Sequence, residues 1–191
     1  MDEVRRRLAA GQYAQAARAC EDVEIDGAEA SQNEALWEVQ IACKLIAGDT
    51  DGARFSWKRM PDRFRQGPQV QALGKVLETL WRRDFAAFHR EKGGHPWCQT
   101  LQPLMAALSQ EVHAQIEAEI QQAYSTIALQ DLCALLAISR EEGIQVVERN
   151  GWTLDGDFAH VVEAPAQAEA ALPENAIHSL TKYVVHLDSS K

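Results

Sequence analysis

Three side chains that could bind a metal ion lie close together in the sequence, namely His89, His95 and Cys98. Imidazole nitrogen and thiolate sulfur are ligands that structural zinc sites commonly use. Such sites take about four ligands, usually in two pairs with about two to five residues between the members of a pair. Taken together, these three residues match no common zinc pattern, because Cys98 has no second cysteine near it and a fourth ligand is not evident. We therefore expect no metal site here.

The other histidines are isolated, and ordinary surface or core positions account for residues of this kind. The chain has no glycine-rich phosphate loop, no GxSxG motif and no HExxH motif. The acidic groups "REE" and "DGD" are more typical of a solvated helix face and a turn than of paired catalytic carboxylates. These observations predict a protein that is not an enzyme and that has no cofactor and no small-molecule substrate. The isolated histidines are His113, His160, His178 and His186.

The stretch "ARFSWKRMP" (Ala53 to Pro61) places two aromatic residues among three cations and could therefore stack on a base or a substrate ring. Trp57 shares a helix face with Ala53 and Met60, because these residues are spaced by four and three positions. The cations lie mostly off that face, and Pro61 favours the end of the helix. We therefore predict that Trp57 packs between helices and does not bind a ligand.

The 191-residue chain has room for one or two small domains with apolar cores, and its 46% hydrophobic content is ordinary for a globular protein. No run approaches the ~18 apolar residues of a membrane helix. The start, "MDEVRRRLAAG", lacks the apolar core of a secretory signal, so we predict no membrane association. The cysteines are scattered without a CxxC pair, which suits buried thiols in a reducing compartment and predicts the cytoplasm and nucleus.

Residues 1–105 are predicted to form a helical-repeat bundle of short α-helices in pairs. Gly11 and Gly48 are expected to end helices, because glycine readily adopts the left-handed backbone geometry found at such ends. The segments "LAAGQYAQAAR" and "LIAGDTDGAR" both read Leu-x-Ala-Gly and then Ala-Arg, at an offset of about 37 residues. This echo predicts stacked helical hairpins like tetratricopeptide repeats.

Residues 106–165 are predicted to form a winged-helix subdomain. Apolar residues recur every four positions along one long helix, "PLMAALSQEVHAQIEAEIQQAY". A short strand is expected at Ser125–Leu129, followed by two compact helices, the second of which starts with Ser139 and Glu142 as a capping box. Two strands in "WTLDGDFAHVVEA" complete the order helix, strand, helix, helix, hairpin, which is typical of a winged helix. The predicted fold class is therefore mainly α, with a small β-sheet.

Residues 166–191 are predicted to hold a linker and a C-terminal helix. The stretch "EAPAQAEAALPEN" is rich in Ala, Pro and Glu and has nothing to bury. The helix after it has an apolar stripe, and a helix of this length is marginal alone, so the stripe must dock on something. It could dock on this chain, or the linker could let it reach a partner protein. The stripe consists of Ile177, Leu180, Tyr183, Val184 and Leu187.

A winged helix first suggests DNA binding through its second compact helix, which here reads "SREEGIQVVERN". That helix has two cations and three anions, and the whole chain has a net charge of −9. Phosphates repel such a surface, so we predict no nucleic-acid partner. The strands are expected to pair edge to edge with the sheet of another protein. A nucleic-acid-binding regulator remains the alternative from a different class.

Six segments carry a resemblance to a known family. They are "ARFSWKRMP", "LWRRDF", "QPLMAAL", "AYSTIALQDLCALLAI", "NGWTLD" and "LTKYVVHLD". In this order they are similar to segments of the COP9 signalosome subunit 8 family of PCI-domain proteins, and "NGWTLD" and the final helix look plant-like. The first fifty residues resemble the family only in helical character. The resemblance implies helical repeats followed by a winged helix, in a complex that removes Nedd8 from cullins.

The resemblance further implies a non-catalytic scaffold subunit, because the isopeptidase of that complex is a different subunit with a zinc-binding HxH motif. Assembly is expected through the winged-helix edge and a bundle of C-terminal helices, with PCI subunit 3 as the foremost partner among the other subunits. Paralogous PCI subunits of the proteasome lid or of translation initiation factor 3 remain same-class alternatives. The implied interaction residues are Ser125, Thr126, Ile127, Leu129, Trp152, Phe158 and Val161 at the edge, and Ile177, Leu180, Tyr183, Val184 and Leu187 in the bundle.

Overall fold

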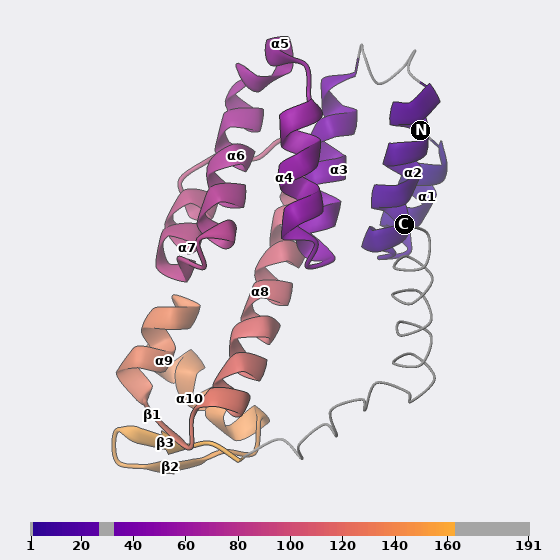
Figure 1. Ribbon diagram of the computed structural model, residues 1–191. Coiled ribbons are helices and arrows are strands. Elements are labelled where there is room, and N and C mark those ends of the chain that lie inside the picture. Colours follow the sequence, from indigo (N-terminus) through magenta and orange to yellow (C-terminus); the bar gives the residue numbers. More distant parts are fainter. Residues whose placement is uncertain (1, 27–32, 163–191) are drawn as a thin grey trace, which may run out of the picture.

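The computed structural model describes residues 2–26 and 33–162, and the predicted C-terminal helix lies outside these ranges. The described chain is mainly α-helical and carries one small antiparallel sheet (Figure 1). The helices are α1 (Asp2–Ala9), α2 (Tyr13–Asp26), α3 (Glu34–Ile46), α4 (Thr50–Arg59), α5 (Asp62–Arg65), α6 (Pro68–Trp81), α7 (Phe85–Gly93), α8 (Leu101–Ala123), α9 (Leu129–Leu136) and α10 (Arg140–Arg149). The strands are β1 (Thr126–Ala128), β2 (Thr153–Asp155) and β3 (Phe158–His160).

The helices from α1 to α7 form a layer in which chain neighbours pack on one another: α1 on α2, α2 on α3, α3 on α4, and α6 on α7 (Figure 1). Gly11 and Gly48 have φ values of 67° and 75° where the chain turns between helices, which confirms the predicted helix ends. Every residue of α3 from Leu36 to Ile46 is buried. The helical layer is therefore built around α3.

A polar network joins α3 to both of its chain neighbours. The Lys44 ammonium lies 2.5 Å from the Glu21 carboxylate of α2 and donates a hydrogen bond of 2.9 Å to the Ser56 hydroxyl of α4. Glu24 of α2 accepts hydrogen bonds from Gln40 at 2.9 Å and from Arg59 at 2.7 Å. These contacts satisfy polar groups that the packing of α3 would otherwise leave unpaired.

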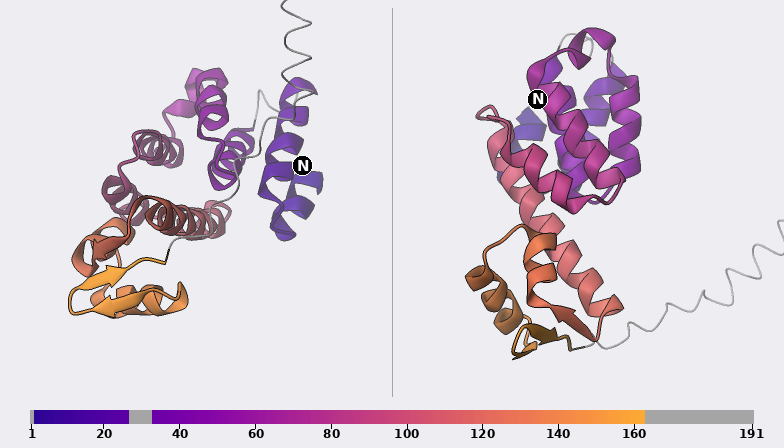
Figure 2. Two further views of the ribbon diagram at one scale, coloured as in Figure 1. Left: turned by 60° about the horizontal axis from the view of Figure 1, so that its bottom comes forward. Right: turned by 90° about the vertical axis from the view of Figure 1, so that its left-hand side faces the viewer.

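The 23-residue helix α8 runs from the helical layer to the sheet (Figure 2). It packs against α3 in the layer and against α9 beside the sheet. Its buried residues recur at intervals of four, as predicted, because these positions share one face of a helix. The predicted domain boundary at residue 105 falls inside α8, so this helix belongs to both halves of the molecule. The buried stripe includes Leu104, Leu108, Val112, Ile116 and Ile120.

The sheet has the order β1-β3-β2, and both pairings are antiparallel. Ile127 lies opposite Ala159 in the register, and both side chains are buried. Gly156, with φ 60°, occupies the first central position of the two-residue turn between β2 and β3, as in a type II′ hairpin. α9 contacts β1 and α10 contacts β2, so the predicted strand, helices and hairpin form one compact module.

Local residues fix the start and the packing of α10. The Ser139 hydroxyl accepts a hydrogen bond from the Glu142 N–H at 3.3 Å, and the Glu142 carboxylate accepts one from the Ser139 N–H at 2.9 Å. The predicted capping box is thereby confirmed. At Gly143, a Cβ atom would lie 2.5 Å from the Cys133 sulfur, so only glycine allows α10 to approach α9 this closely.

Trp57 packs from α4 onto α6. A Cβ atom at Gly74 would lie 2.4 Å from the six-membered part of the indole, so the ring rests directly on the backbone of α6. Ala53 and Met60, on the same face of α4, are 0% and 1% exposed. The prediction that Trp57 is a packing residue is confirmed, although the outer part of its side chain stays accessible.

Candidate protein-interaction surface

The backbone of β1 is hydrogen-bonded to the hairpin on one side. The Ser125 carbonyl accepts a bond of 3.0 Å from the hairpin, and the Leu129 N–H donates one of 2.8 Å to it. Backbone groups of an antiparallel strand alternate in direction, so the N–H groups of Thr126 and Ala128 point away from β3. Among residues 2–26 and 33–162 no strand pairs with this row, and a row of this kind can accept another strand, so β1 offers an open edge.

The edge strand β2 has the same property on the far side of the sheet. Asp155 and Phe158 close the hairpin, and Thr153 lies opposite His160. Thr153 and Asp155 of β2 direct their backbone groups toward β3, so the N–H and C=O of Leu154, which lies between them, point outward. β3 is therefore paired on both sides, while β1 and β2 are its open neighbours.

The predicted edge residues separate into an exposed and a buried group. Ser125, Thr126 and Phe158 are exposed, and the Thr126 hydroxyl lies 3.1 Å from Nδ1 of His160 on the solvent-facing side. Four others pack in the core and are at most 8% exposed, so their side chains support the sheet from inside and do not line its open edge: Ile127, Leu129, Trp152 and Val161. The five predicted bundle residues, Ile177, Leu180, Tyr183, Val184 and Leu187, lie outside the described residues.

Large apolar side chains also lie exposed on the sheet module. Phe158 is 54% exposed, and Tyr124, Val162 and Leu154 are 49%, 57% and 40% exposed. Sequence analysis predicted Phe158 and missed the other three. Leu154 lies in a strand of only three residues, which is too short to show an alternation of buried and exposed positions, and Tyr124 and Val162 lie outside the strands.

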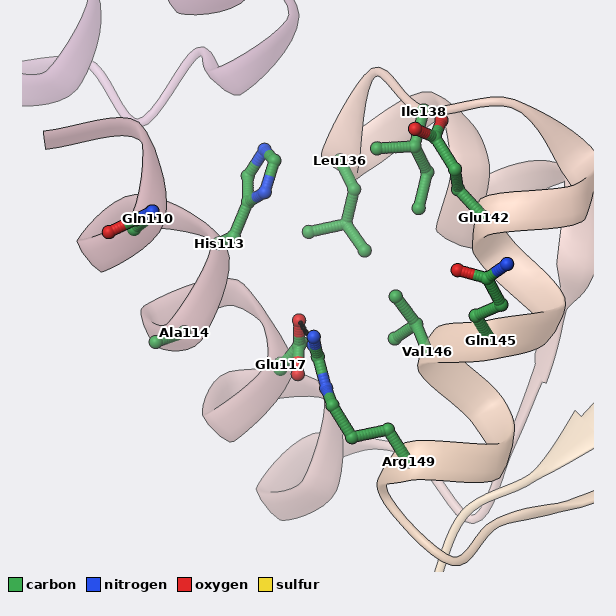
Figure 3. A pocket seen from close by; sticks show the side chains of 10 residues that line it. All are labelled: Gln110, His113, Ala114, Glu117, Leu136, Ile138, Glu142, Gln145, Val146 and Arg149. Carbon is green, nitrogen blue, oxygen red and sulfur yellow. Dashed lines mark hydrogen bonds and ion pairs between the residues drawn. The ribbon is translucent and has the colours of Figure 1, made fainter. Parts of the chain in front are cut away.

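A cavity of about 840 Å³ lies between α8 and α10 (Figure 3). The side chains of Leu136 and Val146 extend into it from the sheet module (Figure 3). An ion pair of 2.6 Å between Arg149 and Glu117 bridges the two helices, and the Asn150 amide donates to the other Glu117 oxygen at 2.9 Å. The cavity is therefore closed off on one side by paired polar groups.

His113 of α8 also lines this cavity, and its ring centroid lies 5.1 Å from that of His89 on α7. Burial, followed by the charges of His113 and Lys92, lowers the pKa of His89 to about 4. Burial likewise lowers the pKa of His113, and Lys92 acts in the same direction. Both rings are therefore neutral at pH 7. They pack where the helical layer meets α9.

The candidate metal ligands make separate contacts. The His95 ring packs edge-on against Trp97 with centroids 4.9 Å apart, and the Cys98 N–H donates to the Gln69 amide oxygen at 3.4 Å. Within residues 2–26 and 33–162, no group of three or more His, Cys, Asp or Glu side chains could hold a metal ion. In the same ranges, no helix has the length and apolar character that crossing a bilayer requires.

These features define a class of mainly α proteins in which a helical layer carries a compact strand–helix–helix–hairpin module with open sheet edges. The chain belongs to the CSN8/PSMD8/EIF3K family, whose sequence model matches residues 33–172. The match begins just before α3 and includes the whole sheet module, so it covers both halves of the molecule.

Proteins named COP9 signalosome complex subunit 8 are similar to this chain over most of their length. The protein from Arabidopsis thaliana is 29% identical over 155 residues, which are 80% of this chain and 79% of the relative. The protein from Xenopus tropicalis is 26% identical over 176 residues, or 89% of this chain and 90% of the relative. The protein from Danio rerio is 27% identical over 149 residues, or 76% and 78%. The resemblance carried by the six sequence segments is thereby confirmed.

Proposed function

We propose that this chain is a non-catalytic scaffold subunit of the COP9 signalosome, which removes Nedd8 from the cullins of cullin-RING ubiquitin ligases. The observation that carries the proposal is the similarity to proteins named as subunit 8 of that complex, over 76% to 90% of each chain. The isopeptidase is then a different subunit, and this chain acts in the cytoplasm and nucleus as part of the assembly.

In this proposal, the helical layer is a tetratricopeptide-like repeat, and residues 106–165 form a winged helix that begins within α8. The order α8, β1, α9, α10, β2, β3 supports the second assignment, because β1 pairs with the hairpin as the first strand of a winged helix does. The glycine turns and the side-by-side packing of successive helices support the first.

We assign the contact with the other subunits, foremost PCI subunit 3, to the open edge of β1. The outward N–H groups of Thr126 and Ala128 support this assignment, because a strand added there would gain backbone hydrogen bonds. Ser125 and Thr126 would flank the added strand, and Phe158 would offer an apolar contact on the exposed face of the sheet. The C-terminal segment that contains Ile177 and Leu187 would enter the bundle of C-terminal helices.

Replacing Ala128 by proline tests the assignment sharply. Ala128 has φ −69° and ψ 136°, which proline adopts without strain, and its N–H does not serve the β1–β3 pairing. We expect Ala128→Pro to keep the melting temperature within a few degrees of that of the wild type and to reduce recovery of the other subunits at least about tenfold, since blocking the edge removes a backbone bond and adds a clash. The measurement is affinity purification of the tagged full chain from its own cells under gentle lysis.

Ala128→Ser is the matched control, because it changes the side chain and keeps the N–H. It should be incorporated like the wild type. Normal incorporation of Ala128→Pro would remove the β1 edge from the proposal. A wild-type chain recovered as a monomer would overturn the scaffold role itself, and recovery with proteasome-lid or initiation-factor subunits would move the chain to one of those paralogous positions.

A further inference from the structure

Positive charge is concentrated in one part of this acidic protein. Residues 53–92, which reach from α4 into α7, contain ten Lys or Arg residues and four Asp or Glu residues, a net charge of +6. Because the whole chain has a net charge of −9, the remaining residues carry −15. A basic region of this kind draws acidic partners toward it.

Helices α4 and α6 of this basic part lie next to each other (Figure 1). An apolar groove of about 460 Å³ lies between them. The indole of Trp57, resting on Gly74, forms its floor. Trp81, at the last turn of α6, lines the groove and is 49% exposed. Two indole rings are therefore accessible to one bulky apolar side chain of a ligand.

The rim of the groove has more positive than negative charge available. The Arg54 guanidinium lies 4.7 Å above the Trp81 ring and has no carboxylate partner within the described ranges. The Lys75 ammonium lies 3.8 Å from Glu91 and is 65% exposed. Glu78, an acid in the lining, is held by Arg82 at 2.6 Å. Arg54 and Lys75 can therefore bind carboxylates of a ligand.

We propose that the groove between α4 and α6 binds an acidic amphipathic helix of a partner protein. The helix would place one bulky apolar side chain between Trp57 and Trp81, and its carboxylates would reach Arg54 and Lys75. The α6 residues that line the groove, from Gln71 to Trp81, follow the three- and four-residue spacing of one helix face, which suits recognition of a helix laid alongside. This surface is separate from the β1 edge, so the proposal that it binds an acidic helix does not depend on the proposed role in the signalosome.

Single-stranded nucleic acid is the other ligand that aromatic rings and arginine attract, but it fits this surface less well. Phosphate binding needs a row of free cations, because each bound phosphate must be neutralised. Four arginines of the basic part already pair with carboxylates of this chain. The pairs are Arg59 with Glu24, Arg65 with Asp62, Arg82 with Glu78, and Arg83 with Glu119. The two indole rings and the few free cations that remain suit a ligand with one bulky apolar side chain and a few carboxylates better than they suit a chain of phosphates.

The test uses the full chain and a synthetic, fluorescein-labelled helical peptide of about four turns. One face of the peptide bears Phe and Leu, and the other positions bear Glu. We expect a dissociation constant on the order of 10–100 μM by fluorescence anisotropy, weakening as salt is raised because the rim contacts are exposed. The same peptide with Lys in place of Glu should bind at least about tenfold more weakly.

Two variants of the chain locate the binding site. Arg54→Glu combined with Lys75→Glu should weaken binding of the acidic peptide at least about tenfold and strengthen binding of the Lys peptide. Trp81→Gln should also weaken binding of the acidic peptide. Because Trp81 is exposed, this variant should fold normally, and an unchanged melting temperature would show that the weaker binding does not come from misfolding. The matched control is Arg18→Glu, which reverses an exposed cation of α2 outside the basic part and should change neither affinity.

Three outcomes would overturn the proposal. The first is absent binding of the acidic peptide, or equal binding by the wild-type and charge-reversed chains. The second is tighter binding of oligouridine RNA, lost in the same variants, which would assign the surface to nucleic acid. The third is peptide binding that emerges only after removal of residues 163–191, which would show that this chain's own segment fills the groove. None of these outcomes depends on incorporation into the signalosome.

Discussion

The carboxyl group of Glu38 is enclosed on α3, and the residue is 8% exposed. Burial, followed by the negative charge of Glu34, raises its pKa to about 7 from the ordinary value of 4.5. The folded chain therefore binds this proton more tightly than the unfolded chain. The favourable contribution of the protonated carboxyl to stability is fully present below about pH 4.5 and is lost as the pH rises through 7.

Glu38→Gln should consequently stabilise the chain at high pH. Glutamine keeps the shape and removes the titration, so the free energy of unfolding at pH 8 should rise by on the order of 1–3 kcal/mol, since one pKa unit corresponds to about 1.4 kcal/mol. Near pH 4 the two chains should differ little, because the carboxyl is then protonated. Urea unfolding at both pH values measures the difference. The control Glu111→Gln, at an exposed position of α8, should have little effect at either pH, and an equal gain for Glu38→Gln at both would contradict the assignment.

At the scale of elements, the helix ends could be predicted because they depend on neighbours in sequence. Gly11, Gly48 and the pair Ser139–Glu142 are examples. The burial of every residue of α3 from Leu36 to Ile46 could not be predicted. Its polar residues suggest a solvated face, but Lys44 finds its partners on α2 and α4, and only the tertiary fold brings these together.

The candidate surface at the β1 edge could likewise be predicted only where it depends on residues close together in the sequence. The strand expected at Ser125–Leu129 is one residue shorter at each end, and Leu129 begins α9, whereas the hairpin lies about the turn "DGD" as predicted. The direction of each backbone group depends on the pairing of Ile127 with Ala159, a contact between residues far apart in sequence. The sequence predicts the strand, but only the pairing with β3 shows that the N–H groups of Thr126 and Ala128 face outward. The surplus of cations in residues 53–92 is evident in the sequence, but the groove depends on the contact of Trp57 with Gly74, which only the packing of α4 on α6 brings about.

The packing of α4 on α6 can be tested by a double-mutant cycle at Trp57 and Gly74. Gly74→Ala should destabilise the wild-type chain by about 1–3 kcal/mol, because the new methyl group would displace the indole. In a Trp57→Ala background the same change should stabilise by up to about 1 kcal/mol, since alanine is the better helix former. Trp57→Ala alone should cost about 3–5 kcal/mol, as large-to-small core changes do, or less where the outer ring is accessible. Thermal unfolding of the four chains gives the cycle, and additive effects would contradict direct contact.

At the scale of the whole molecule, the described halves share one continuous core, which runs from Val4 in α1 to Val161 after β3. α8 contributes to both ends of that core through its four-residue stripe. The described chain is therefore one body, on which the two proposed binding surfaces, the β1 edge and the groove between α4 and α6, lie apart. The C-terminal segment is attached beyond the sheet module and should be removable without loss of this body.

Deleting residues 175–191 should separate folding from assembly. We expect the melting temperature to change by no more than a few degrees, because the core from Val4 to Val161 is formed by residues outside this segment. Incorporation into the proposed complex should fall at least severalfold, because the deletion removes the apolar stripe that we assign to the helical bundle. Size-exclusion chromatography of cell extracts, with detection of the tagged chain, measures the fraction in the large assembly. Lys182→Gln, at a position off the stripe, is the control and should leave that fraction unchanged, and normal assembly of the deletion would contradict the bundle contact.

The length of α8 has a consequence for how the two surfaces are presented. Its 23 residues span about 35 Å at a rise of about 1.5 Å per residue. Because each residue also turns the helix by about 100°, α8 sets an angle as well as a distance between the helical layer and the sheet. One residue inserted between the two ends would advance the sheet by only about 1.5 Å yet swing the β1 edge by more than a right angle. Partners held at the groove and at the edge would then meet a molecule of nearly the same length whose two binding faces point in different directions.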